Sequence, residues 1–344
     1  MNRTSILCLC LSCCFLLQGF SVLEVTAQSE TMEYIAIIQE GQERFLQPII
    51  GSFLASHPVF SSLLGRALEK HYTQHSAVEF ASYINQSLTL KFIDGSYVVL
   101  LDVFASHPEL SSQPIRTSHS VVSSEEPTAL ILNPSEYLYG NFFCRRIISH
   151  LIAKGYNIEY RANEAVNLSY IKQHLGAEIV YMNTHAGYWD IDGDHTADAV
   201  VIATGELWTN ETEEIYSFEF ENQMIVKGVV GSKSFVSFTP ALITYSYNEE
   251  TLPSSLIYMA TCHATADASM ATAFLQAGAE VYLGWNHDTV FWTNLLTSCL
   301  AFRLLVRGFS VQQICFLLRS GGFFNFLYHS KLHYIGNGNH RIVD

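Results

Sequence analysis

Residues 256–264 read LIYMATCHA, a run of large apolar side chains that ends in a cysteine and a histidine. A second run, AEIVYMNT at 177–184, leads in the same way into His185. Short apolar runs with little alternation are typical of strands that are buried on both faces. The two stretches therefore predict two buried strands, each ending beside a side chain that can do chemistry.

Similar apolar runs occur over much of the chain. Helical patterns separate further apolar runs, and strands that alternate with helices form mostly parallel sheets with helices on both faces. The predicted strands are 128–134, 156–162, 177–184, 255–261 and 279–285, and the predicted helices between them include 136–154, 168–175 and 264–276. With right-handed crossovers, this order predicts an α/β fold for 127–344, a three-layer α/β/α sandwich. Its site is expected at the carboxyl ends of the strands.

The amino-terminal part of the chain differs in composition. Residues 1–27 combine a basic start with an apolar stretch and end in Val-Thr-Ala, the pattern of a signal peptide that is cleaved near Ala27. We therefore expect a secreted, extracellular product, without a membrane span because no later apolar stretch is long enough and free of charge. Residues 28–126 are expected to be a propeptide or accessory region, with helices, a hairpin around Asp94-Gly95 and a Ser-rich linker.

Charge and cysteine content narrow the possible functions. The chain has 18 basic and 32 acidic residues, a formal net charge of −14. This balance argues against a nucleic-acid partner, which requires a basic face. Four cysteines remain after cleavage, too few for a disulfide scaffold in a chain of this length. Cys144, Cys299 and Cys315 lie in apolar helical patterns and are expected to be buried, although a bridge between Cys299 and Cys315 stays open.

Cys262 stands apart because it follows a predicted strand, as His185 does. If the two strands are neighbours, a thiol and an imidazole meet at one edge of the sheet. The thiolate can then attack a carbonyl carbon while the imidazole handles the proton of the leaving group. The main-chain N–H groups of Ala186, Gly187 and Cys262 are the candidate donors to an oxyanion.

These two motifs resemble those of the caspase, legumain, gingipain and clostripain clan of cysteine peptidases, where His-Gly and Ala-Cys end adjacent strands. The segment AFLQAGAEVYLGWNHDTV (273–290) is similar to the strand that follows the nucleophile in gingipain-like members. The resemblance covers residues 128 to 290. It implies that His185 is the general acid/base, that Cys262 is the nucleophile and that Trp285 lies at a pocket wall.

Acidic side chains near the motifs suggest further roles. Asp190, Asp192 and Asp194 alternate before a turn and resemble the start of a calcium loop, but no glutamate completes an EF-hand, so a solvated turn is an equal alternative. Calcium dependence among gingipain- and clostripain-like proteins favours Ca²⁺ by analogy. Glu206 and Asp267 are candidate pocket acids, with solvated carboxylates as the alternative.

Two functions fit this sequence. The first is a secreted cysteine endopeptidase that acts on peptides or proteins through a thioester, with no cofactor needed for the chemistry. The second is an inactive extracellular binding or surface protein of the same fold, possible because Ala186 replaces the clan's Gly and Thr261 replaces its Ala. A serine hydrolase is excluded, since the chain lacks Gly-x-Ser-x-Gly.

Overall fold

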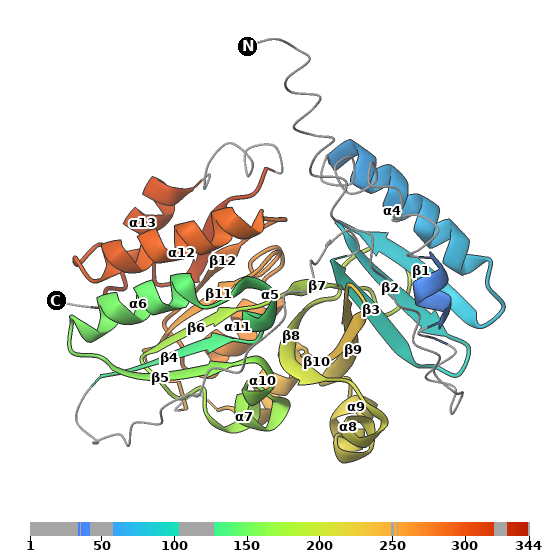
Figure 1. Ribbon diagram of the computed structural model, residues 1–344, viewed down its shortest axis with the longest axis horizontal. Helices are drawn as coiled ribbons and strands as arrows, with labels where there is room; N and C mark the ends of the chain where they lie inside the picture. Colours follow the sequence, from blue (N-terminus) through green and yellow to red (C-terminus); the bar gives the residue numbers. More distant parts are fainter. Residues whose placement is uncertain are drawn as a thin grey trace, which may run out of the picture.

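The computed structural model describes residues 34, 36–41, 58–102, 127–248, 251–252, 254–319 and 329–342. It contains two β-sheets with helices packed against them (Figure 1). The predicted signal peptide and most of the predicted Ser-rich linker lie outside the described residues. The α/β class predicted from the sequence is confirmed.

A six-stranded sheet, called sheet B here, forms the centre of the 127–344 region. Its strand order is β13-β12-β11-β6-β4-β5, and all neighbours are parallel except β12 and β13. The bounds are β4 Thr128–Asn133, β5 Asn157–Ala162, β6 Ile179–Asn183, β11 Leu256–Ala260, β12 Val281–Trp285 and β13 Leu332–Gly336. All five predicted strands are thus present and form one mostly parallel sheet.

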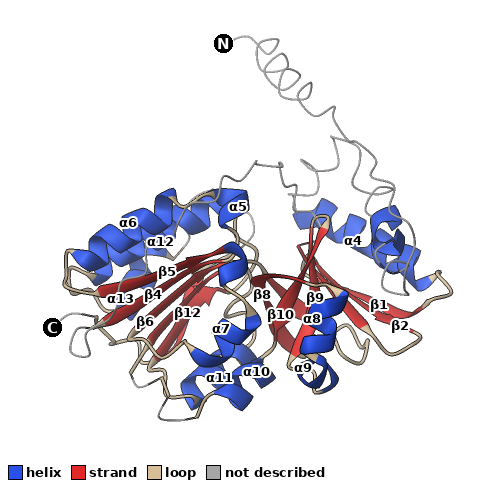
Figure 2. Cartoon of the chain, turned by 60° about the horizontal axis from the view of Figure 1, so that its bottom comes forward, coloured by secondary structure: helices blue, strands red, loops and turns tan. Residues whose placement is uncertain are grey.

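Both faces of sheet B are buried because alternate side chains enter two different apolar clusters. Tyr181 and Tyr258 belong to the cluster under α6, α12 and α13, whereas Met182 and Met259 belong to the cluster with α7, α10 and α11. The bounds are α6 Phe142–Ile152, α7 Leu168–Gln173, α10 Pro240–Ser246, α11 Ser269–Gln276, α12 Phe291–Leu305 and α13 Val311–Leu318. Figure 2 shows the two groups of helices on opposite sides of the strands. Burial on both faces explains why these strands lack polar alternation.

A seven-stranded sheet, sheet A, joins the amino-terminal region to the segment between the two motifs. Its order is β1-β2-β3-β9-β10-β8-β7, so three early strands continue into four later ones. The bounds are β1 Val78–Ile84, β2 Ser87–Phe92, β3 Tyr97–Asp102, β7 Ala186–Trp189, β8 Ala199–Leu207, β9 Ile225–Val230 and β10 Lys233–Phe238. The hairpin predicted around Asp94-Gly95 is confirmed as β2–β3.

The junction within sheet A is a strand pair with a shared core. β3 pairs in parallel with β9, and Val99 and Leu101 of β3 are buried with Trp189 of β7 and Val201 of β8. The helix α4, Pro58–Thr73, covers the early strands through Leu68 and Tyr72. Residues 78–102 and 186–238 therefore share one sheet, and removal of the amino-terminal region as a propeptide would remove three of its strands.

Several helices differ from their predicted bounds. Gly140, with φ 68°, divides the predicted helix 136–154 into α5 (Glu136–Tyr139) and α6. The helix after Cys262 begins only at Ser269, because residues 261–268 form turns. Shorter elements complete the description: η2 Asn163–Ala165, α8 Asn210–Ile215 and α9 Ser217–Glu221. Within the described residues, every helix is too short or too polar to cross a membrane.

Candidate functional site

The two motifs lie on neighbouring strands. β6 and β11 pair in parallel along their whole length, and the last pair is Asn183 with Ala260. His185 and Cys262 each follow their strand by two residues, so both come from the same edge of the sheet. Adjacent parallel strands lie about 4.8 Å apart. The two strands that precede the proposed dyad are therefore direct neighbours in the sheet.

The contacts of the two side chains lie on neighbouring elements. His185 contacts Tyr139 of α5, and Cys262 contacts Thr289, just before α12. Tyr139 in turn stacks on Phe291, the first residue of α12.

The candidate site lies at the edge of the sheet where the topology predicts ligand binding. The order β5-β4-β6-β11-β12 reverses direction between β4 and β6, and ligands of open α/β sheets bind at the carboxyl ends near such a reversal. Tyr139 belongs to α5, which follows β4, and its hydroxyl lies 3.0 Å from His185 Nε2. The Tyr139 ring stacks on Phe291 at 3.6 Å between centroids. This packing fixes the tyrosine that orients the imidazole.

The thiol of Cys262 is half-buried and has a main-chain donor. The N–H of Thr289 donates to Sγ at 3.3 Å, and the carbonyl oxygen of Thr289 lies 3.7 Å from Sγ. Hydrogen bonding to a charged form favours that form. The amide of Thr289 is therefore placed to stabilise a thiolate at Cys262.

A close contact between buried His263 and Asp288 ties the turn after β11 to the loop that carries Thr289. His263 is 1% exposed, and its Nε2 lies 2.6 Å from Asp288 Oδ1. Its backbone has φ 57°, in the left-handed region that non-glycine residues seldom adopt, and its ring packs on Tyr188 at 4.5 Å. His263 lies in the turns that follow β11.

The other three cysteines are poor nucleophiles. All four thiols are free, so Cys299 and Cys315 are not bridged. Burial raises the pKa of Cys144 and of Cys315 to about 12. Partial burial also raises the pKa of Cys299. Since the thiolate is the reactive form, these three remain protonated near neutral pH.

The candidate oxyanion donors differ in availability. In β7, Tyr188 and Asp190 donate their N–H groups toward β2, to Ser87 Oγ at 3.0 Å and Thr89 Oγ1 at 3.2 Å. Because N–H directions alternate along a strand, Gly187 points its N–H at β8 instead. Ala186 points its N–H to the side away from β8, where β7 is the edge strand. Of these two residues, Ala186 is therefore the better donor.

Each of the three predicted pocket residues has a structural partner of its own. Trp285 is completely buried, and its Nε1 donates to Asn294 Oδ1 at 2.9 Å, so it belongs to the core and not to a pocket wall. Glu206 accepts the N–H of Leu168 at 2.9 Å, at the start of α7. Asp267 accepts the N–H of Ser269 at 2.7 Å, in the turn that precedes α11. Glu206 and Asp267 thus bind helix ends.

The carboxylates of Asp190, Asp192 and Asp194 do gather, with oxygens within 4.8 Å of one another. Asp190 is buried and accepts the N–H groups of Gly193 and His195 at 2.6 and 2.9 Å. Asp194 accepts the N–H of Thr196 at 2.7 Å. These contacts organise the loop by themselves, so calcium binding stays a prediction.

A cavity of about 440 Å³ adjoins the loop after β12, whose Thr289 contacts Cys262. His287 and Asp288 line it from this loop, and Asn85 lines it from the β1–β2 turn. Tyr188, which packs on His263, forms a side-chain hydrogen bond with Asn85. Burial raises the pKa of Tyr188 to about 12, because its effect is larger than that of this bond, which lowers the pKa. The cavity thus lies between the amino-terminal strands and the segments that carry the dyad.

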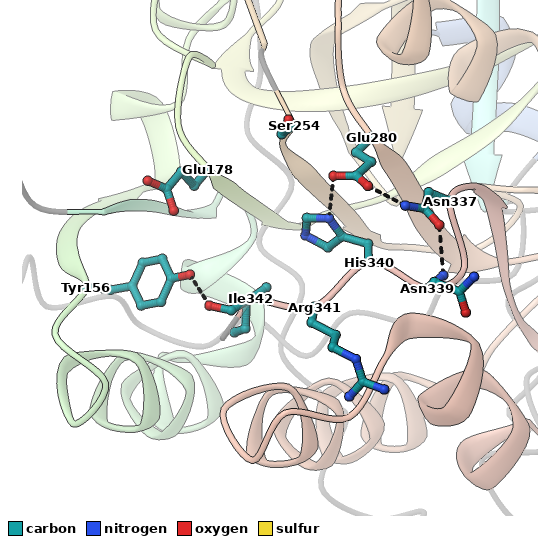
Figure 3. A pocket seen from close by; sticks show the side chains of 9 residues that line it. All are labelled: Tyr156, Glu178, Ser254, Glu280, Asn337, Asn339, His340, Arg341 and Ile342. Atoms are coloured by element: carbon teal, nitrogen blue, oxygen red, sulfur yellow. Dashed lines mark hydrogen bonds and ion pairs between the residues drawn. The ribbon is translucent and has the colours of Figure 1, made fainter. Parts of the chain in front are cut away.

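A second cavity, of about 390 Å³, lies near the amino ends of the sheet B strands (Figure 3). Glu280 lines this cavity and contacts two residues of the carboxyl-terminal segment. His340 Nδ1 lies 2.8 Å from Glu280 Oε2, and Asn337 donates a hydrogen bond to Glu280 Oε1. Partial burial would raise the pKa of Glu280, but the hydrogen bonds from His340 and Asn337 lower it overall. We interpret this cavity as the seat of the carboxyl-terminal segment.

No model of a known protein family matches this chain, and comparison with curated proteins finds no match. The resemblance to the cysteine peptidase clan therefore rests on the two motifs and their surroundings.

Sequence reasoning missed Tyr139, Thr289 and Asp288. Tyr139 and Thr289 follow the carboxyl ends of β4 and β12, which flank the two motif strands in sheet B. Searching the residues after every predicted strand, and not only after two, would have included them.

Proposed function

We propose that the protein is a secreted cysteine endopeptidase with a three-layer α/β/α fold of the caspase and gingipain type. The observation that supports this proposal is the in-register parallel pairing of β6 with β11, because His185 and Cys262 follow these two strands by the same number of residues at the carboxyl edge of sheet B. The donor from Thr289 and the contact from Tyr139 add to it, because a nucleophile needs a stabilised thiolate and its base needs an orienting partner.

In the proposed reaction, the Cys262 thiolate attacks the scissile carbonyl carbon and forms a C–S bond. The carbonyl electrons move to the oxygen, where the N–H groups of Ala186 and Cys262 are the candidate donors. The C–N bond then breaks, and the His185 imidazolium gives its proton to the leaving amine. Water attacks the thioester, His185 takes its proton, and the acid leaves as the thiolate is restored.

The alternative function is an extracellular binding protein without catalysis, and two observations favour it. The N–H of Gly187 is directed to β8, and α11 begins at Ser269, so no helix amino terminus stands directly behind Cys262. Without these donors, a thiolate or an oxyanion at this site has less electrostatic stabilisation. The remaining donors are the amides of Thr289, Ala186 and Cys262.

Covalent labelling separates the two functions. Residues 28–344 would be treated with acyloxymethyl-ketone peptides that differ in the residue before the warhead, and the modified thiol would be identified by peptide mapping. We expect selective labelling of Cys262 that depends on this residue and is lost in His185→Ala. Cys299 provides an internal control, since it is half-buried but has no imidazole partner in the proposal.

The binding-protein function predicts another result. Iodoacetamide would still alkylate Cys262, because it is half-buried, but the peptide reagents would show no selectivity, and His185→Ala would leave their labelling unchanged. This pattern, also after limited proteolysis of the amino-terminal region, would eliminate the peptidase proposal.

A further inference from the structure

Three outer helices differ in charge from the chain as a whole. Residues 137–158 and 289–319, which contain α6, α12 and α13, hold no aspartate or glutamate and six of the 18 lysines and arginines. The remainder of the chain has 12 basic against 32 acidic residues. The outer surface of these three helices, called the basic face here, therefore carries positive charge on an otherwise strongly acidic protein.

The cations gather where α6 and α12 pack side by side (Figure 1). Arg146 of α6 and Arg303 of α12, with Arg307 just beyond it, are all exposed. Partial burial and the positive charges of these three arginines lower the pKa of His150. Within the described residues, none of the three has an ion-pair partner. Their charge is thus available to a ligand.

Large apolar side chains share the basic face. Trp292, Leu296 and Leu300 follow one another at every fourth position of α12 and are 65%, 53% and 37% exposed. Residues with this spacing form a row along one side of a helix. On α6, Phe142 is 61% exposed and lies under Arg146, with the guanidinium 5.4 Å from the ring centroid. The rings of Phe142, Phe143 and Trp292 join the two helices in one aromatic cluster.

We propose that the basic face binds the surface of a bilayer that contains anionic phospholipids. Helices that lie in a membrane interface bury Trp, Phe and Leu at the boundary of the acyl chains while arginines contact the phosphates. Here α6 and α12 lie side by side on the outside of the sheet, so their apolar row and their cations are presented together (Figure 2). The acidic remainder of the protein is repelled by the same lipids, which fixes the orientation.

The basic face reaches the candidate site. Trp292 contacts Phe291, which stacks on Tyr139, and Tyr139 contacts His185. Lipid binding would hold this end of sheet B close to the membrane surface. The inference rests on the helices alone and does not require that Cys262 is catalytic.

Intrinsic fluorescence gives a readout that is specific for this face. Trp189, Trp208 and Trp285 are buried, so Trp292 is the exposed member of the four tryptophans. We would mix residues 28–344 with phosphatidylcholine vesicles, with or without phosphatidylglycerol, and combine fluorescence with co-sedimentation. Binding only to vesicles with phosphatidylglycerol is expected, with a blue shift, protection from acrylamide quenching and weakening by salt.

Charge variants test the arginines. At about 1 kcal/mol for each arginine near an anionic surface, Arg146→Glu with Arg303→Glu is expected to weaken binding at least roughly 30-fold. Lys70→Glu with Lys233→Glu changes the net charge equally on exposed lysines elsewhere, and should have little effect. Trp292→Phe should still bind but lose the blue shift.

Three outcomes would overturn the proposal: no co-sedimentation with phosphatidylglycerol vesicles, equal weakening by both double variants, or binding without a change at Trp292. A concentration-dependent dimer that the arginine variants abolish, together with no vesicle binding, would assign the face to a second copy of the chain. Circular dichroism of each variant would exclude misfolding as the cause.

Discussion

Gly187→Ala tests the packing of the early strands against the segment that carries His185. A Cβ at Gly187 would lie 2.7 Å from Ser87 Oγ and 2.9 Å from Leu101 Cα, both closer than real contacts allow. Relieving such a clash costs about 1–3 kcal/mol. Moving Ser87 also weakens its hydrogen bond from the Tyr188 N–H, worth about 1 kcal/mol. Since alanine favours a strand over glycine by roughly 0.5–1 kcal/mol, we expect a net loss of about 2 kcal/mol.

Urea unfolding of the full chain would measure this loss. Gly176→Ala is the matched control, because its Cβ would lie 3.4 Å from Thr251 O, an ordinary contact, and a change within about 0.5 kcal/mol is expected. In a Ser87→Ala background the cost of Gly187→Ala should fall, since one of the two clashing atoms is gone. Equal costs for the two glycines, or no coupling with Ser87, would refute the packing of β7 against β2 and β3.

Four further predictions follow from the same coordinates. Cutting the chain at an engineered protease site between residues 103 and 126 should leave two fragments that co-elute, because β3 and β9 share a sheet; a free amino-terminal fragment would contradict this. Burial lowers the pKa of Lys227 from 10.5 to about 8. The cost in folding free energy of burying its charged ammonium is therefore complete below pH 8 and vanishes above pH 10.5. Lys227→Met should therefore stabilise the protein by roughly 3 kcal/mol at pH 7 and by less as the pH approaches 10, and a gain independent of pH would refute this. Asp288→Asn should slow the alkylation of Cys262 by iodoacetamide several-fold at pH 7, since the loop with the Thr289 donor loses its carboxylate contact with His263; an unchanged rate would show that this contact does not position the donor. If the aspartate cluster binds calcium, Ca²⁺ but not Mg²⁺ should raise the melting temperature, and Asp194→Asn should abolish the shift; no shift would leave the cluster as a loop motif.

The central strands of sheet B, such as β6 and β11, were predictable because each is an apolar run with a sharp end. Burial on both faces removes polar residues from β6 and β11, and this composition is visible without any structure. The hairpin β2–β3 was predictable for a local reason as well, since Asp94 and Gly95 favour the turn. Gly95 has φ 88°, which suits glycine.

Contacts between distant segments left no comparable signal. β9 reads IVKGVV, and nothing in this stretch indicates that β3, more than 100 residues earlier, will pair with it. The late start of α11 has a local cause that the apolar pattern hides: Asp267 accepts the N–H of Ser269, a side-chain contact that competes with helix formation. Trp285 was placed at a pocket by resemblance, whereas Asn294 of α12 binds its indole within the core.

The central claim is that His185 and Cys262 meet at the edge of sheet B, and disulfide trapping tests it directly. Residues in register on adjacent strands lie within the Cα separation that a disulfide requires. Under mild oxidation, His185→Cys should form a bridge to Cys262 that non-reducing peptide mapping detects. Ala186→Cys, which is directed to the opposite face, should form none. Absence of the bridge in the first variant, or equal bridging in both, would contradict the proposed dyad.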